Sequence, residues 1–141
     1  MTLPKTLTTG DVRAGQALPE ETIEVTPTFV ISTALATRDF QDVHHDRDLA
    51  RAGGARDVFL NILTTTGVVQ RYVTDWAGPE ALVRGVDVKL GVPCCAYDEL
   101  RLFGQVLERD DGGVLTVEVL GRTARGDHVT GKVRLVLPEV R

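Results

Sequence analysis

Residues 61–76, NILTTTGVVQRYVTDW, set the architecture, because they form the one segment with a sustained helical pattern of apolar side chains. One face of this helix collects the side chains of Ile62, Val69, Val73 and Trp76. Asn61 is a preferred N-cap residue, and the sequence Ala77-Gly78-Pro79 ends the helix. An apolar face of this length must be buried, so we predict a core helix from about Asn61 to Trp76.

After this helix, Val- and Leu-rich segments alternate with turn residues, a pattern typical of antiparallel strands. We predict strands at Val86–Val92, Leu100–Leu107, Val114–Gly121 and Val129–Leu137. The breaks between them are Pro93, residues 110–113 (Asp-Asp-Gly-Gly) and residues 125–127, and the second of these is a hairpin signal.

Before the helix, Phe29–Leu35 is predicted to be a short strand, because aromatic and β-branched residues favour strands. A charged loop over residues 38–57 follows, with a short helical turn at Asp46–Ala52. Residues 1–26 are polar and rich in Thr, Pro and Gly, so we expect a partly ordered arm rather than a core element. The domain then spans residues 27–141. This order of elements indicates an α+β fold in which a curved antiparallel sheet wraps around one helix, as in a single hot-dog domain.

The composition excludes several classes of function. The formal net charge of −4 and the aromatic content of 5% argue against nucleic-acid binding, which needs a basic surface and stacking side chains. No segment approaches about 20 consecutive apolar residues, so no membrane span is expected, and residues 1–6 lack the apolar region of a signal peptide. Cys94 and Cys95 are adjacent and point to opposite faces of a strand, so we expect two reduced thiols in a cytoplasmic protein.

Asp39 and His44 are the first candidates for chemistry. They lie five residues apart in the charged loop, where a turn can bring a carboxylate and an imidazole to one cavity. Such a pair suits the addition of water to a polarised double bond, because it can activate the water and deliver a proton to carbon. The alternative is that Asp39 caps a turn and His44 is a surface or hydrogen-bonded histidine.

The neighbouring His45 and Asp46 have simpler interpretations, a solvated loop and an N-cap. A metal site formed by His44, His45 and Asp46 is disfavoured, because adjacent histidines rarely converge on one ion and His128 lies in another strand.

The start of the central helix is the second chemical feature. Its first amides have no intrahelical partner and carry a positive potential. An amide near Asn61 can therefore stabilise the oxygen of a thioester as it becomes enolate-like. Simple N-capping is the alternative for Asn61, and both roles can coexist because the cap uses the side chain and the oxyanion site uses the backbone N–H.

The stretch from Asp39 to Ala50 resembles the signature of the MaoC-type (R)-specific enoyl-CoA hydratases, D-x-N-P-[ILV]-H-x-D followed four residues later by a small residue. This sequence keeps the two aspartates, the histidine, an aliphatic residue before it and the small residue: Asp39, Val43, His44, Asp46 and Ala50. It departs at Gln41 and Asp42, where the family usually has Asn and Pro, which changes the loop and leaves the Asp–His pair intact.

Four segments resemble one subgroup, the small single-hot-dog subunit of the heteromeric steroid enoyl-CoA hydratases of bacterial cholesterol side-chain degradation. They are residues 32–46 (STALATRDFQDVHHD), 70–79 (QRYVTDWAGP), 90–93 (LGVP) and 126–130 (GDHVT). The resemblance covers about residues 27–137.

The resemblance implies that Asp39 and His44 are the catalytic pair and that Asn61 takes the place of the family's oxyanion glycine, so that only its backbone role transfers. It implies a larger MaoC-domain subunit as partner in a heterotetramer, and a pregnene-type steroid carboxyl-CoA as substrate, with no separate cofactor because coenzyme A is part of the substrate. A chain of 141 residues is too short to enclose a steroid and coenzyme A alone, which also favours a partner.

Two other functions stay open. A hot-dog thioesterase usually has a carboxylate at the start of the central helix, and none lies between Asn61 and Thr74. A non-catalytic stabilising subunit would not need both Asp39 and His44. Four arginines, Arg71, Arg84, Arg122 and Arg125, are of a type that binds coenzyme A phosphates, and the sequence assigns none of them.

Overall fold

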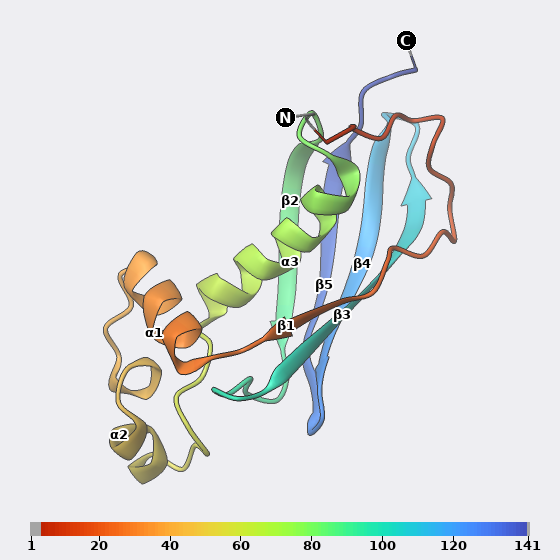
Figure 1. Cartoon of the computed structure of the whole chain (residues 1–141). Helices are drawn as coiled ribbons and strands as arrows, with labels where there is room; N and C mark the ends of the chain where they lie inside the picture. Colours follow the sequence, from red (N-terminus) through yellow and green to blue (C-terminus); the bar gives the residue numbers. More distant parts are fainter. Residues whose placement is uncertain (1–3, 141) are drawn as a thin grey trace.

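The computed structural model describes residues 4–140, in which five strands form one antiparallel sheet and the long helix lies against one of its faces (Figure 1). The elements are β1 (Glu21–Glu24), α1 (Pro27–Ala36), the 3₁₀ turn η1 (Asp42–His44), α2 (Arg47–Ala52), α3 (Ile62–Ala77), β2 (Leu82–Leu90), β3 (Glu99–Arg109), β4 (Val114–Thr123) and β5 (Gly126–Val136). The strand order is β1-β3-β4-β5-β2, so β1 and β2 are the two edges. The predicted α+β hot-dog architecture is confirmed.

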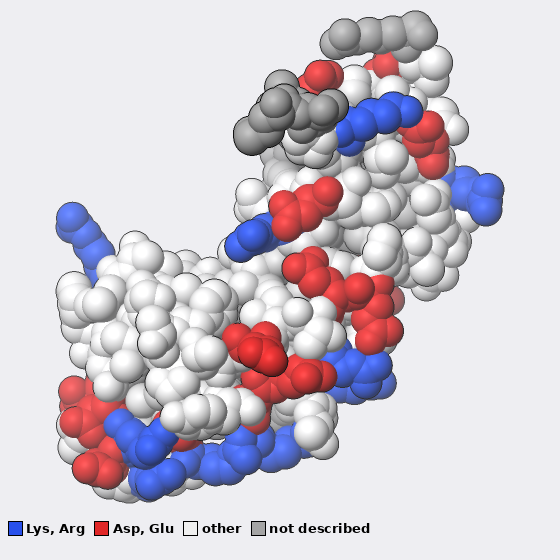
Figure 2. Space-filling model, in the orientation of Figure 1, with Lys and Arg blue, Asp and Glu red and all other residues white. Residues whose placement is uncertain are grey.

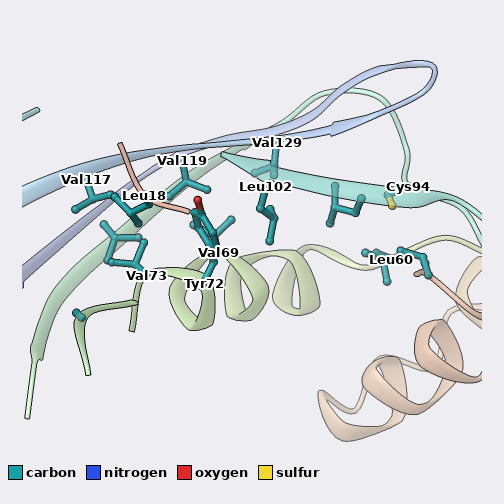
Figure 3. Close-up of a cluster of buried hydrophobic side chains, with 14 of the residues drawn as sticks. Leu18, Leu60, Val69, Tyr72, Val73, Cys94, Leu102, Val117, Val119 and Val129 are labelled. Atoms are coloured by element: carbon teal, nitrogen blue, oxygen red, sulfur yellow. The ribbon is translucent and has the colours of Figure 1, made fainter. Parts of the chain in front are cut away.

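The core lies between α3 and the sheet. Figure 3 shows Val69, Tyr72 and Val73 of α3 beneath a row of side chains from three strands: Leu102 of β3, Val117 and Val119 of β4, and Val129 of β5. These residues are almost fully buried. The predicted helix is therefore confirmed, with Asn61 as its N-cap.

Ile62 departs from this prediction, because its side chain is 53% exposed. Side chains on a helix point back toward its N-terminus. At the first helical position this direction carries the side chain past the helix end rather than onto the sheet. Thr65, one turn further on, is fully buried instead.

The prediction of a strand at Phe29–Leu35 is wrong, since these residues belong to α1. Thr26 caps this helix, with its Oγ1 accepting a hydrogen bond from the Phe29 N–H at 3.0 Å, and Pro27 occupies the first turn. The hydroxyl of Thr33 donates to the Phe29 carbonyl, which satisfies a polar group within the helix. The Thr-Pro pair was the available signal for a helix start, and the β-branched run after it masked that signal.

The expectation that residues 1–26 contribute no core element is also wrong. Residues 21–24 form β1, which pairs with β3, and Ala17 forms an isolated bridge to Gln105. Leu18 and Val25 are buried in the core. This edge strand is hard to predict because it is short and mostly exposed, and its acidic side chains at Glu21 and Glu24 resemble a loop.

The remaining strands agree with the predicted segments. β2 begins earlier than predicted, at Leu82, because a register irregularity between Val83 and Gly85 interrupts the alternation. Residues 110–113 connect β3 to β4, and Gly113 has a φ of 83°, which glycine adopts without strain. Cys94 and Cys95 are free and buried, as expected, and burial raises the pKa of the Cys94 thiol to about 12. Within residues 4–140, no helix has the length and apolar character needed to span a membrane.

Candidate active site

A turn between α1 and α2 brings together the aspartate and the histidine that the sequence singles out. After α1 ends, Arg38 adopts a left-handed backbone with a φ of 54°. The Asp39 N–H then donates to the Ala34 carbonyl at 2.9 Å, which turns the chain back along the helix. η1 completes the turn, and its last residue, His44, faces Asp39.

Asp39 Oδ2 lies 3.3 Å from His44 Nε2. The His44 side chain is 6% exposed, whereas the Asp39 side chain is 26% exposed. A buried imidazole therefore faces a carboxylate that water can reach. His44 is not a surface histidine, and the five-residue spacing does place the two groups at one site.

The hydrogen bonds of His44 define which of its nitrogens faces Asp39. Nδ1 lies 2.7 Å from the Phe59 carbonyl oxygen, which can only accept, so Nδ1 carries a proton. The Phe59 ring packs edge-on against the imidazole at a centroid distance of 5.0 Å. In the neutral histidine the lone pair is therefore on Nε2, the atom nearest Asp39.

Both oxygens of Asp39 are held by donors. The Gln41 N–H donates to Oδ1 at 3.2 Å, and the Asn61 Nδ2 amide donates to Oδ2 at 3.1 Å. The hydrogen bond from the Asn61 side chain is the main reason that the pKa of Asp39 lies below its ordinary range, although partial burial opposes it. The Asp39 carboxylate therefore stays ionised at neutral pH.

Asn61 joins the helix start to this pair through its side chain, a role that the sequence prediction missed. Its Oδ1 accepts the Thr64 N–H at 2.9 Å as the N-cap of α3, while its Nδ2 donates to Thr37 Oγ1 at 2.8 Å as well as to Asp39. Asparagine in a position where the resemblance expects glycine was the available signal. The Asn61 backbone N–H has no acceptor among the bonds found within residues 4–140.

The neighbouring residues of the loop have structural roles. His45 Nε2 donates to the Asp39 carbonyl at 2.6 Å, which fixes the backbone of the aspartate. Asp46 caps α2, with Oδ1 accepting the Leu49 N–H at 3.0 Å. The N-cap interpretation of Asp46 is confirmed, and the predicted helical turn at Asp46–Ala52 is α2.

A cavity of about 530 Å³ lies two hydrogen bonds away from Asp39, with Asn61 as the link between its wall and the Asp–His pair. Thr37 and Thr64, both bonded to Asn61, form part of its wall. Most of the remaining wall is apolar and comes from α1, α3, β1 and β3: Ile23, Phe29, Ala36, Leu63, Val68, Tyr72 and Leu102. In Figure 2 the surface over α1 is largely uncharged, whereas acidic and basic side chains gather around α2 at the lower edge.

A second cavity, of about 600 Å³, has a basic wall. Arg122 and Arg125 contribute to it, and Arg125 shares the buried carboxylate of Asp98 with Arg56. Arg71 lies instead at the edge of the apolar cavity.

Comparison with known proteins identifies relatives over most of the chain. No family model matches the sequence. The β subunit of 3-oxo-4,17-pregnadiene-20-carboxyl-CoA hydratase from Mycobacterium tuberculosis is 59% identical over 121 residues, covering 86% of this chain and 93% of that protein. A chain in the crystal structure of the ChsH1-ChsH2 complex from the same organism is 57% identical, with a TM-score of 0.86, over 89% of this chain and 98% of that one.

More distant structures share the fold. The (R)-hydratase of A. caviae that is involved in PHA biosynthesis has a TM-score of 0.82 and 18% identity, over 90% of this chain and 98% of its own. A MaoC-like dehydratase has a TM-score of 0.83 and 19% identity, over 97% of this chain and 44% of its own.

Proposed function

This chain belongs to the family of MaoC-like enoyl-CoA hydratases, with the β subunit of a steroid carboxyl-CoA hydratase among its relatives, and from this premise we propose that it is the catalytic small subunit of a heteromeric hydratase. The observation that carries the proposal is the contact of 3.3 Å between Asp39 Oδ2 and His44 Nε2 beside an apolar cavity. The reaction is the addition of water across the double bond of an α,β-unsaturated acyl-CoA.

In this reaction the water lies beside the pair and contacts both the Asp39 carboxylate and His44 Nε2. His44 Nε2 accepts a proton as the water oxygen bonds to the β-carbon, and it then delivers a proton to the α-carbon. The ionised carboxylate of Asp39 stabilises the imidazolium that exists between these two events. One water is consumed, with its hydroxyl on the β-carbon and one hydrogen on the α-carbon.

The thioester carbonyl gains negative charge as the water adds. We propose that the Asn61 N–H, for which no acceptor is found within residues 4–140, donates to this oxygen, because the first amides of a helix are free and carry positive potential. This is the backbone role expected from the sequence. It is compatible with the side-chain contacts of Asn61, which use other atoms.

The substrate that we propose is a steroid carboxyl-CoA, by analogy with the relative named for 3-oxo-4,17-pregnadiene-20-carboxyl-CoA. The apolar walls of the cavity suit a hydrocarbon ring system rather than a polar acyl group. The chemistry needs no metal or redox group, so we propose no cofactor other than the coenzyme A of the substrate.

The partner that we propose is a larger subunit with its own MaoC-type domain, seated along β2. β2 is a nine-residue edge strand whose only hydrogen-bonded strand neighbour within residues 4–140 is β5. Leu82 and Leu90 at its two ends are exposed, as is Ile62 at the start of α3. An open edge beside exposed apolar side chains is suited to pairing with another sheet. The ChsH1-ChsH2 complex gives a precedent for a hydratase built from two different chains.

The test is co-expression of this chain with a MaoC-type partner, followed by incubation with 3-oxo-4,17-pregnadiene-20-carboxyl-CoA and mass spectrometry of the product. We expect the wild-type complex to add one water and both His44→Ala and Asp39→Asn to lose this activity. Asp42→Asn is the matched control, because Asp42 lies in the same loop and is exposed, so this variant keeps wild-type activity.

Two outcomes contradict the proposal. Water addition that survives both substitutions makes this chain a stabilising subunit whose partner performs the chemistry. Release of free coenzyme A indicates a thioesterase, a function that the first half of α3 does not favour because it contains no carboxylate.

A further inference from the structure

Thr64 carries an unexplained hydroxyl. Within residues 4–140, Thr64 Oγ1 is the one buried side-chain polar atom that has no hydrogen-bond partner. The residue is 6% exposed, so bulk water does not replace the missing partner. Buried polar groups almost always have a partner, so this hydroxyl at a cavity wall is a candidate for a contact with a ligand or an ordered water.

The hydroxyls of the other threonines in this region have hydrogen-bond partners, so the missing partner is specific to Thr64. On the same helix, Thr66 Oγ1 donates to the Ile62 carbonyl at 2.8 Å, and Thr65 Oγ1 pairs with His128 Nε2 at 2.8 Å. On α1, Thr33 and Thr37 donate to carbonyls of the preceding turn. Thr64 makes no such internal bond, although it also lies on a helix.

The position of Thr64 connects the cavity to the Asp–His pair. The residue lines the apolar cavity, and its backbone N–H donates to Asn61 Oδ1. Thr64 lies in the first turn of α3, three residues after Asn61. It therefore lines the cavity and is joined through Asn61 to Asp39.

We propose that the Thr64 hydroxyl donates a hydrogen bond to the carbonyl oxygen of the acyl thioester, as a second donor beside the Asn61 N–H. The inference rests on the proposed function for the identity of the ligand. Of the atoms near the reacting carbons, the thioester oxygen is a strong acceptor and the sulfur is a weak one. The side chains of Leu63, Val68 and Phe29 in the cavity wall are apolar and have no hydrogen-bond donor for this oxygen. Two donors at one helix start form an oxyanion site that strengthens as the carbonyl gains charge.

Three variants of the co-expressed full-length complex test this role. Thr64→Val removes the hydroxyl and keeps the shape, whereas Thr64→Ser keeps the hydroxyl. Thr66→Val on the same helix is the matched control, since the hydroxyl that it removes is bonded inside the helix. We expect Thr64→Val to lower kcat by about 10- to 100-fold with a smaller change in KM, and Thr64→Ser to stay within about threefold of wild type.

The thermal midpoint separates this role from a structural one. Thr64→Val breaks no internal bond, so its complex melts at or above the wild-type temperature while its activity falls. A Thr64→Val complex with wild-type kcat, or one whose activity loss is matched by a lower melting temperature, would overturn the proposal.

A binding measurement keeps the inference distinct from the proposed function. Butyryl-CoA has the thioester carbonyl and no double bond, so it binds without reacting. We expect it to raise the melting temperature of the wild-type and Thr64→Ser complexes more than that of Thr64→Val. If the wild-type complex adds no water but this difference is present, the proposed reaction fails and the thioester contact stands. An equal shift in all three complexes rejects the contact, whatever the reaction proves to be.

Discussion

Exchanging Asn61 for aspartate is the sharpest test of how the carboxylate of Asp39 is held. In the wild type, Asn61 Nδ2 donates to Asp39 Oδ2 at 3.1 Å and keeps the pKa of Asp39 low. Asn61→Asp has the same shape and is an equally good N-cap. It replaces that donor with a second carboxylate oxygen, so two negative charges then compete for one site.

The size of the expected pKa change follows from how close the two carboxylates of Asn61→Asp would lie. Two unit charges about 4 Å apart interact by about 4 kcal/mol at an effective dielectric constant of about 20. The Asp39 side chain is 26% exposed, so solvent screening reduces this to roughly 2 kcal/mol, or about 1.5 pKa units. Loss of the Asn61 hydrogen bond adds roughly one further unit. We therefore expect the pair of carboxylates in Asn61→Asp to take up a proton at a distinctly higher pH than Asp39 does in the wild type.

The assay is the pH profile of kcat/KM for the co-expressed complex between about pH 5 and pH 9. Because activity needs the Asp39 carboxylate ionised, the activity of Asn61→Asp falls at the acid end of this range and recovers toward the alkaline end. Asn61→Ser is the matched control, since serine caps the helix but is too short to reach Asp39. It lowers activity without introducing a new titration in this range. The reasoning fails if the loss in Asn61→Asp is the same at pH 6 and pH 9.

Three further predictions concern stability. His128 is 2% exposed and burial lowers its pKa, so the unfolded chain binds a proton more readily than the folded one. The free energy of unfolding therefore falls as the pH drops below about 6.5, by at most about 1.4 kcal/mol per pH unit. Urea titrations at pH 7.5 and 5.5 should show a smaller difference in this free energy for His128→Gln than for the wild type. Leu135→Ala lowers the free energy of unfolding by about 2–5 kcal/mol, because Leu135 is fully buried on β5. Leu107→Ala changes it by less than about 1 kcal/mol, because Leu107 is 37% exposed. Equal effects of the two substitutions would contradict the position of the core. Thr26→Ala removes the cap of α1 and costs about 1 kcal/mol in chemical denaturation, while Thr26→Ser stays near wild type.

The parts of the fold that were predictable have a strong periodic signal. Val69 and Val73 repeat at helical spacing, and the alternation after Val86 marks a strand, so α3 and the late strands follow from local pattern alone. β1 and α1 lack such a signal. β1 is held by pairing with β3, about 80 residues away, and α1 contains a β-branched run that local propensity assigns to a strand. Tertiary pairing decided β1, whereas α1 follows a local helix-start signal at Thr26 and Pro27 that the β-branched run outweighed.

The residue types of the site could be predicted from the sequence, but the hydrogen bonds that connect them could not. Asp39, His44 and Asn61 were all selected from the sequence, and the structure brings the three side chains to one place. The connection of Asn61 to Asp39 spans 22 residues and depends on where α1 ends relative to α3. No local pattern encodes that distance. The unpaired hydroxyl of Thr64 was invisible for the same reason, since a Thr-Thr-Thr run gives no indication of which hydroxyl has a partner.

The hydrogen bonds around Asp39 and His44 also favour different roles for the two residues in the proposed reaction. Asp39 accepts from Gln41 and Asn61, and each of these donors stabilises the ionised form and makes the carboxylate a weaker base. His44 has a different arrangement, because the bond from Nδ1 to the Phe59 carbonyl leaves the lone pair on Nε2, the atom that faces Asp39. A carboxylate held ionised is suited to fixing the water and stabilising an imidazolium, and a free Nε2 is suited to moving the proton. We therefore propose that His44, rather than Asp39, transfers the proton to the α-carbon. Both substitutions take the activity far below wild type, but Asp39→Asn, which can still hold a water, should then keep a larger residual activity than His44→Ala; the reverse order would exchange the two roles.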